Sequence, residues 1–209
     1  LGLLKNLTVL GISQNSLSGA IPNEVGSLTG MSLLSLWGNS LTGTLPTELG
    51  LMTNIEELYL FQNFLTGTLS STLGLLTKLT VLDIFQNSLS GTIPSELGIM
   101  SSMDDLNLWK NRLTGTIPPE LGLLNALGRL WLDENRLTGT IPSELGLSTA
   151  LTSLALSVNG LTGTIPTELH LLTSLAMLWI NGNSLTGTIP TEVGLLSNIA
   201  ELYLQNNSV

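Results

Sequence analysis

Residues 27–50 read SLTGMSLLSLWGNSLTGTLPTELG, and residues 51–74 read LMTNIEELYLFQNFLTGTLSSTLG, so the second stretch repeats the pattern of the first position by position. This repetition predicts a chain built from stacked copies of one small unit. The unbroken phase predicts a single domain over 1–209, with eight full units and part of a ninth. One asparagine marks the unit along the whole chain, at Asn15, Asn39, Asn63, Asn87, Asn111, Asn135, Asn159, Asn183 and Asn207.

Each unit carries two apolar residues two positions apart, such as Leu34 and Leu36, which places both side chains on one face of a short strand. We expect nine such strands to stack as a parallel sheet, about 4.8 Å apart. A single unit buries too little apolar surface to offset the entropy lost on ordering its chain. Stacking of neighbouring units must therefore stabilise the fold.

The other repeated residues are interpreted as structural. Each asparagine follows its strand at the turn, where its amide can satisfy buried backbone groups. The glycine at Gly43 and its equivalents indicates a positive φ or a close approach of the next coil. The proline at Pro46 and its equivalents predicts a short extended stretch before it and a helical turn after it.

The pattern LxxLxLxxNxLxGxIPxxLgxLxx resembles the plant-specific class of leucine-rich repeats. That class includes the ectodomains of receptor-like kinases and receptor-like proteins, and the polygalacturonase inhibitors; similar arrays occur in algae. The resemblance implies an α/β fold: a curved right-handed solenoid with a parallel sheet on its concave side and short helical or 3-10 turns on its convex side. It also implies a secreted or cell-surface protein without catalytic activity, which binds a peptide or protein along the concave sheet.

Three departures from the family pattern stand out. Plant members usually carry cysteine-paired caps, whereas this chain has no cysteine, so we expect a fragment of a longer chain that lacks its caps. Residues 67–74 read GTLSSTLG, without the usual proline and glutamate. Ser148 replaces the apolar residue found at Leu28 and Leu124, which predicts a slightly looser core unless its hydroxyl bonds to the backbone.

Composition argues against several partners. The formal net charge of -9 is unsuited to nucleic acid or to an anionic membrane, both of which need clustered cations. The chain has no apolar run of about 20 residues, so no membrane insertion of this segment is expected. The first residues, LGLLKNLTVL, match LGLLTKLTVL at 73–82 and therefore belong to the repeat rather than to a signal peptide.

Aromatic residues interrupt the period where side chains should face away from the core. Eight of the nine aromatics flank the strand leucines, and only Phe64 lies elsewhere. Four of the eight share one position in consecutive units and should form a ladder about 14 Å long on strand spacing. Exposed apolar patches usually mark contact surfaces, which favours binding over mere stabilisation of the sheet. The predicted anchors are Trp37, Tyr59, Phe61, Phe85, Trp109 and Trp131.

Charged residues near the ladder could set the polarity of a ligand. Ordinary surface charge explains their presence equally well. The candidates are Asp83, Asp105, Lys110, Arg129 and Asp133.

No catalytic, cofactor or metal site is predicted. The only histidine, His170, occupies a convex glycine position, and no His/Cys cluster suited to zinc exists. Two sequons, at Asn6 and Asn206, are candidate glycosylation sites.

Alternatives to peptide binding stay open. Aromatic faces also stack on sugars, so a carbohydrate or cell-wall ligand is the second hypothesis. The third is an adhesive or ice-binding surface protein, because threonines such as Thr66 and Thr68 form a regular T-x-T array. For that array we favour a structural role, in which threonine fills an extended stretch and bonds to the backbone.

Overall fold

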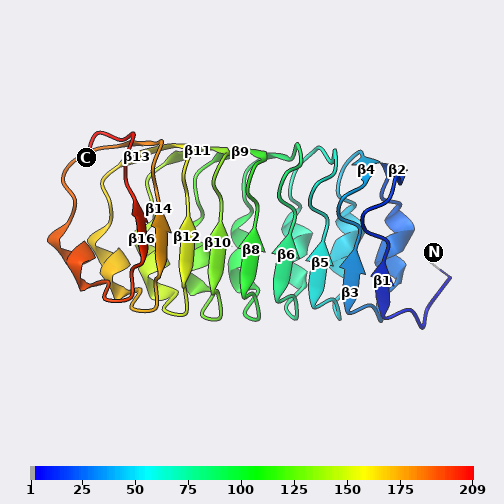
Figure 1. Ribbon diagram of the computed structural model, residues 1–209. Helices are drawn as coiled ribbons and strands as arrows, with labels where there is room; N and C mark the ends of the chain where they lie inside the picture. The colour runs from blue at the N-terminus through cyan, green and yellow to red at the C-terminus, as the bar shows by residue number, and fades with distance from the viewer. Residues whose placement is uncertain (1–2) are drawn as a thin grey trace.

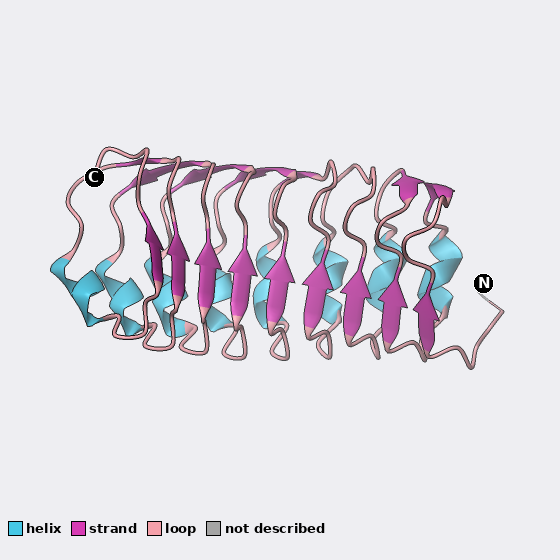
Figure 2. Cartoon of the chain, in the orientation of Figure 1, coloured by secondary structure: helices cyan, strands magenta, loops and turns pink. Residues whose placement is uncertain are grey.

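The computed structural model describes residues 3–209, so the first two residues of the predicted array lie outside it. Within these residues, successive coils lie side by side and run from the N-terminus to the C-terminus in chain order (Figure 1). One long sheet forms one side of the solenoid, and the helical turns lie behind it (Figure 2). This arrangement confirms the predicted leucine-rich repeat solenoid.

The long sheet is parallel throughout, and each strand pairs with the equivalent strand of the next unit, for example Leu34 with Leu58. Because the period holds, the strand leucines point into the interior, where Leu34, Leu36 and Leu58 are buried. Residues between them point to the opposite, concave face. The strands in spatial order are β1 (Val9–Gly11), β3 (Leu33–Ser35), β5 (Glu57–Tyr59), β6 (Val81–Asp83), β8 (Asp105–Asn107), β10 (Arg129–Trp131), β12 (Ser153–Ala155), β14 (Met177–Trp179) and β16 (Glu201–Tyr203).

A short 3-10 helix follows each proline position on the convex side, as predicted. The residue before each helix is extended, as at Pro46 with φ -61° and ψ 135°, and in most coils an acidic residue such as Glu48 lies in the first turn. In the third unit Ser70 replaces the proline, and its Oγ accepts a hydrogen bond from the Thr72 amide at 3.2 Å. The helices are η1 (Asn23–Ser27), η2 (Thr47–Leu51), η3 (Ser71–Leu75), η4 (Ser95–Ile99), η5 (Pro119–Leu123), η6 (Ser143–Leu147), η7 (Thr167–Leu171) and η8 (Thr191–Leu195).

The extended stretches before the helices form further parallel sheets along one edge (Figure 1). Their register does not follow the repeat. Thr162 is the equivalent of Thr138 in the next unit, but Thr138 pairs with Gly160, two positions earlier. This pairing was not predicted from sequence. β2 (Ser18–Ala20) pairs with β4 (Ser40–Thr42), and a second edge sheet contains β7 (Ser90–Gly91), β9 (Arg112–Gly115), β11 (Arg136–Gly139), β13 (Gly160–Gly163) and β15 (Ser184–Leu185).

The repeated asparagine connects neighbouring coils as well as closing its own turn. In a typical coil, the Asn63 Nδ2 donates to the carbonyls of Leu36 and Leu60, both at 3.1 Å, and Oδ1 accepts from the Leu41 amide at 3.0 Å. Leu36 and Leu41 belong to the preceding unit, so one side chain bonds two successive coils. The amide of Asn63 therefore satisfies backbone groups of both coils.

Ser148 has the backbone partners that a buried hydroxyl requires. The residue is fully buried, and its hydroxyl lies within bonding distance of two carbonyl oxygens, 3.3 Å from that of Leu121 and 3.2 Å from that of Gly122. Buried polar groups with such partners are tolerated in a packed interior. The sequence predicted a looser core unless the Ser148 hydroxyl bonds to the backbone, and the structure shows this bonding.

Candidate functional site

Three rows of side chains run along the concave face, because the strands pair in a constant register. In each coil, the first row takes the residue before the two strand leucines, the second row the residue between them, and the third row the residue after them. The first row contains Leu33, Glu57, Val81, Asp105, Arg129, Ser153, Met177 and Glu201. The second row contains Ser35, Tyr59, Asp83, Asn107, Trp131, Ala155, Trp179 and Tyr203. From the second coil onward, the third row contains Trp37, Phe61, Phe85, Trp109, Asp133, Ser157, Asn181 and Gln205.

The four members of the third row in the second to fifth coils form a continuous stack, here called the aromatic ladder: Trp37, Phe61, Phe85 and Trp109. The ring centroids are 4.8 Å, 4.5 Å and 5.3 Å apart along the stack. These steps match the strand spacing, so the backbone holds the rings in contact. Tyr59 meets the edge of Phe61, with 6.5 Å between the two ring centroids.

The ladder rings are half-buried rather than fully exposed, because each ring covers the face of its neighbour. Their remaining accessible surface faces the open side of the sheet. Phe64, which lies off the rows, is by contrast 62% exposed. A ligand would thus meet a ribbon of ring edges held by the sheet, with little conformational entropy left to lose.

Trp131 does not join the ladder. Its ring lies 5.8 Å from that of Trp179, edge to face, and Trp179 stacks on Tyr203 at 5.5 Å. The two indoles lie on either side of the coil that contains Ala155. The side chain of Ala155 is small and fully buried, which leaves room for the indoles to approach each other. This second aromatic cluster contains two residues, Trp179 and Tyr203, that the sequence did not single out as anchors. Their shared row with Trp131 was the available signal.

Acidic groups in the first two rows are partly paired. The Arg129 Nε lies 2.9 Å from the Asp105 Oδ2, and the Tyr59 hydroxyl donates to Glu57 at 2.7 Å. Burial raises the pKa of Asp83 to about 7, and the nearby Asp105 carboxylate contributes to that increase. Burial also raises the pKa of Asp105, against the opposing effect of Arg129. Two of the predicted polar residues, Asp105 and Arg129, therefore bind each other.

Asp133 follows Trp109 in the third row and is buried, with an exposed fraction of 9%. Its Oδ1 is shielded from solvent and has no hydrogen-bond partner within residues 3–209. Burial raises the pKa of Asp133 to about 7.

The end of the ladder is held by its polar neighbours. The Trp109 Nε1 donates to Glu134 at 3.2 Å, and the Lys110 Nζ lies 5.7 Å from the centre of the Trp109 ring. Lys110 is exposed and lies in the turn that follows Trp109, with φ 54°.

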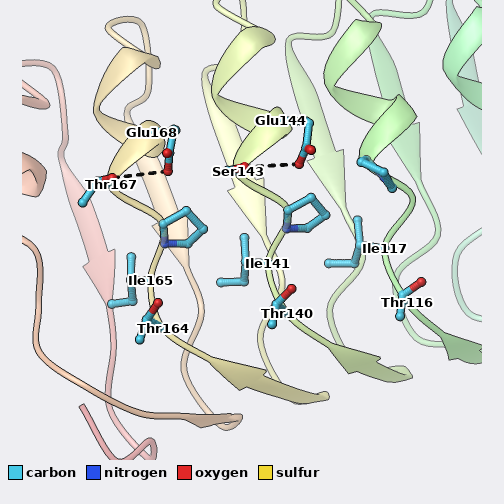
Figure 3. Close-up of a pocket in the computed structure, with 13 residues that line it drawn as sticks. Thr116, Ile117, Thr140, Ile141, Ser143, Glu144, Thr164, Ile165, Thr167 and Glu168 are labelled. Carbon is cyan, nitrogen blue, oxygen red and sulfur yellow. Dashed lines mark hydrogen bonds between the residues drawn. The ribbon is translucent and has the colours of Figure 1, made fainter.

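A different surface contains the threonine array. Thr116, Thr140 and Thr164 are exposed and line a groove together with the isoleucine that follows each of them (Figure 3). Three prolines also line it: Pro119, Pro142 and Pro166. The methyl group of Thr116 lies under the glycine of the next coil, since a β-carbon on Gly139 would lie 2.8 Å from the Thr116 Cγ2.

The threonine two residues earlier in the unit bonds to the backbone of the preceding coil in several units. The Thr138 hydroxyl, for example, donates to the Gly115 carbonyl at 3.4 Å. This part of the array has the structural role that the sequence indicated.

Two further observations concern chemistry and membranes. Among residues 3–209, no three His, Cys, Asp or Glu side chains converge closely enough to hold a metal ion. In the same part of the chain, none of the helices has the length and hydropathy needed to span a bilayer.

Comparison with known proteins supports the fold. The profile of the family described as Leucine Rich Repeat matches residues 6–28, 78–100, 102–124 and 126–147. No curated protein matches the chain in sequence. The plant peptide hormone receptor RGFR1, solved in complex with RGF2, matches with a TM-score of 0.98 and 37% identity over 99% of this chain and 33% of the receptor.

Two other solved structures are informative. The Arabidopsis receptor kinase HAESA, in complex with the peptide hormone IDA and the co-receptor SERK1, matches with a TM-score of 0.93 and 38% identity, over 98% of this chain and 34% of HAESA. A plant ice-binding protein matches with a TM-score of 0.69 and 27% identity, over 97% of this chain and 74% of that protein. The chain thus spans about a third of the length of the two receptors. The constant coil, the family profile and these matches together show that the chain belongs to the leucine-rich repeat proteins, in the class that includes the ectodomains of plant receptor kinases.

Proposed function

We propose that the chain is a recognition domain, without catalytic activity, that binds an extended peptide or a protein segment across the concave sheet. The observation that carries this proposal is the aromatic ladder, four rings in contact on an open face. Aromatic side chains dominate binding energies at interfaces, and rings that are already ordered lose little entropy on binding. RGFR1 is a peptide hormone receptor and HAESA was solved with a peptide hormone, which supports a peptide as the ligand class.

The test begins with selection of random 12-residue peptides displayed on phage against the wild-type chain. Binding of the selected peptides is then measured for the Phe61→Ala/Phe85→Ala double variant, which removes the middle of the ladder. We expect a loss of roughly 2 kcal/mol or more in binding free energy. Phe64→Ala is the matched control, because it makes the same chemical change close by in sequence but off the rows. Equal affinity of wild type and the double variant would contradict the proposal.

An extracellular or cell-surface location forms part of the same proposal, by resemblance to the receptors. Asn6 and Asn206, the two sequon asparagines, are both exposed and accessible to a glycosyltransferase. Secretion from a eukaryotic host should therefore yield glycosylated protein. A mass that decreases after endoglycosidase treatment would agree with this location, and an unmodified mass would count against it.

Ice binding is a second candidate, which the likeness to the plant ice-binding protein favours. The surface concerned is the exposed column that includes Thr116, Thr140 and Thr164, on a different side of the coil from the aromatic ladder. Thermal hysteresis of the wild type against a Thr116→Val/Thr140→Val variant tests it. A measurable hysteresis that the variant loses would support this function, and none in the wild type would exclude it.

A further inference from the structure

Trp109, Trp131 and Asp133 form a corner between the two aromatic groups of the concave face. Trp109 ends the ladder, and Trp131 begins the second cluster in the next coil. Asp133 follows Trp109 in the third row and lies two residues beyond Trp131 on the same face. A ligand that crosses from one aromatic group to the other must pass this corner.

The carboxylate of Asp133 is buried without a counter-charge. Its side chain is 9% exposed, and its Oδ1 atom has no hydrogen-bond partner among the described residues. Buried carboxylates are normally paired, because removal from water destabilises the charged form. Asp105 on the preceding coil pairs its Oδ2 with Arg129 at 2.9 Å, although its Oδ1, like that of Asp83, has no hydrogen-bond partner among the described residues.

The elements packed around Asp133 supply no cation that pairs with it among residues 3–209. On the preceding coil, Lys110 is exposed and its Nζ lies near the Trp109 ring. In the turn that contains Asp133 itself, Glu134 is acidic and accepts a hydrogen bond from the Trp109 indole. On the following coil, Ser157 is neutral, and its hydroxyl lies 2.6 Å from the Asn181 Oδ1.

Indole rings in positions adjoining a carboxylate favour a cationic partner, because the face of an indole attracts positive charge. We propose that the ligand peptide places a lysine or arginine side chain at this corner, where its charged group pairs with Asp133 and its stem packs against Trp109 and Trp131. This inference rests on the proposed function, since it names the chemistry of a ligand for the same face.

The protonation of Asp133 should make this contact depend on pH. Burial raises its pKa to about 7, a hydrogen bond from its own backbone opposes that effect, and Glu134 adds to the increase. A bound cation favours the ionised carboxylate, so binding must release a proton when the pH lies below about 7. Affinity should therefore increase as the pH is raised from 5 to 8.

The test compares peptides selected at pH 8 by the wild type and by Asp133→Asn, using the random 12-residue phage library. Asp133→Asn keeps the shape of the side chain and removes its charge. We expect lysine and arginine to be enriched only in peptides selected by the wild type. Within one wild-type-selected peptide, arginine to citrulline or lysine to norleucine should weaken binding to the wild type on the order of tenfold and abolish the pH dependence. Asp104→Asn, at an exposed acid outside the corner, is the matched control.

The outcomes separate this inference from the proposed function. Peptides whose binding needs Phe61 and Phe85 but shows no preference for a basic residue would overturn the inference and leave the proposed function standing. Peptides whose basic residue matters equally for the wild type and Asp133→Asn would also overturn it. Failure to enrich any peptide over the Phe61→Ala/Phe85→Ala variant would overturn both.

Discussion

At the scale of single residues, close contact between coils decides which side chains the repeat permits. Gly122 in η5 has no unusual φ, but a β-carbon there would lie 2.0 Å from the Glu144 carbonyl oxygen of the next coil. The glycine is thus required by the approach of two backbones rather than by turn geometry.

This contact predicts that Gly122→Ala destabilises the fold by about 2 kcal/mol or more, because the neighbouring backbone must move. Gly194 occupies the same repeat position in η8, yet a β-carbon there meets no atom within 4 Å. Gly194→Ala should therefore be neutral or slightly stabilising. Urea denaturation of both variants provides the measurement, and equal effects of the two substitutions would contradict this explanation.

Asp133 also predicts how stability depends on pH. Its folded pKa of about 7 exceeds that of an unfolded aspartate, so the folded chain binds its proton more tightly. Stability should therefore fall as the pH rises from about 4 to 7, and Asp133→Asn should reduce that fall. Thermal unfolding of both proteins at pH 5 and pH 8 provides the comparison. An identical pH dependence in the variant would show that Asp133 does not titrate in this range. Asp83, with its pKa likewise raised to about 7, should retain part of the effect in the variant.

At the scale of elements, the turn asparagines from Asn39 onward connect one coil to the preceding one. Asn111 donates to the carbonyls of Ile84 and Leu108, at 3.1 Å and 3.2 Å, and accepts from the Leu89 amide at 3.1 Å. Asn111→Ala leaves these buried groups unpaired and should cost about 3 kcal/mol. Asn125→Ala, at an exposed turn, should change stability by less than about 0.5 kcal/mol. If urea denaturation shows only a small decrease in the free energy of unfolding for Asn111→Ala, water replaces the amide.

Sequence alone predicted the elements that depend on the period. The Leu34 and Leu36 pair defined the strands, and the proline position defined the helical turns. The edge sheet escaped prediction because its register falls two positions short of the repeat, with Thr138 opposite Gly160 instead of Thr162. Glycine and threonine are in close contact across the coils of this edge, since a β-carbon on Gly139 would lie 2.8 Å from the Thr116 Cγ2, and the repeat pattern does not specify that contact.

The candidate site was predicted in location but not in its contacts. Position in the period placed the ladder rings in one row. It did not reveal that Trp131 approaches Trp179 across Ala155, since that contact depends on side-chain direction across two coils. Position in the period also did not distinguish Asp105, which pairs with Arg129, from Asp133, which pairs with no cation among the described residues.

At the scale of the whole molecule, the solenoid holds a long face in constant register, with the two aromatic groups in different rows along it. An extended ligand could contact both groups and the polar corner between them. A specific complex of this kind should bury at least about 1,000 Å² in total.

Hydroxyl-radical footprinting of the chain, with and without a selected peptide, tests binding at the concave face most directly. We expect the peptide to protect the ladder residues, Phe61 and Phe85 above all, while Phe64 reacts equally in both samples. Unprotected ladder rings, with protection confined to the threonine edge or the convex helices, would contradict binding at the concave face.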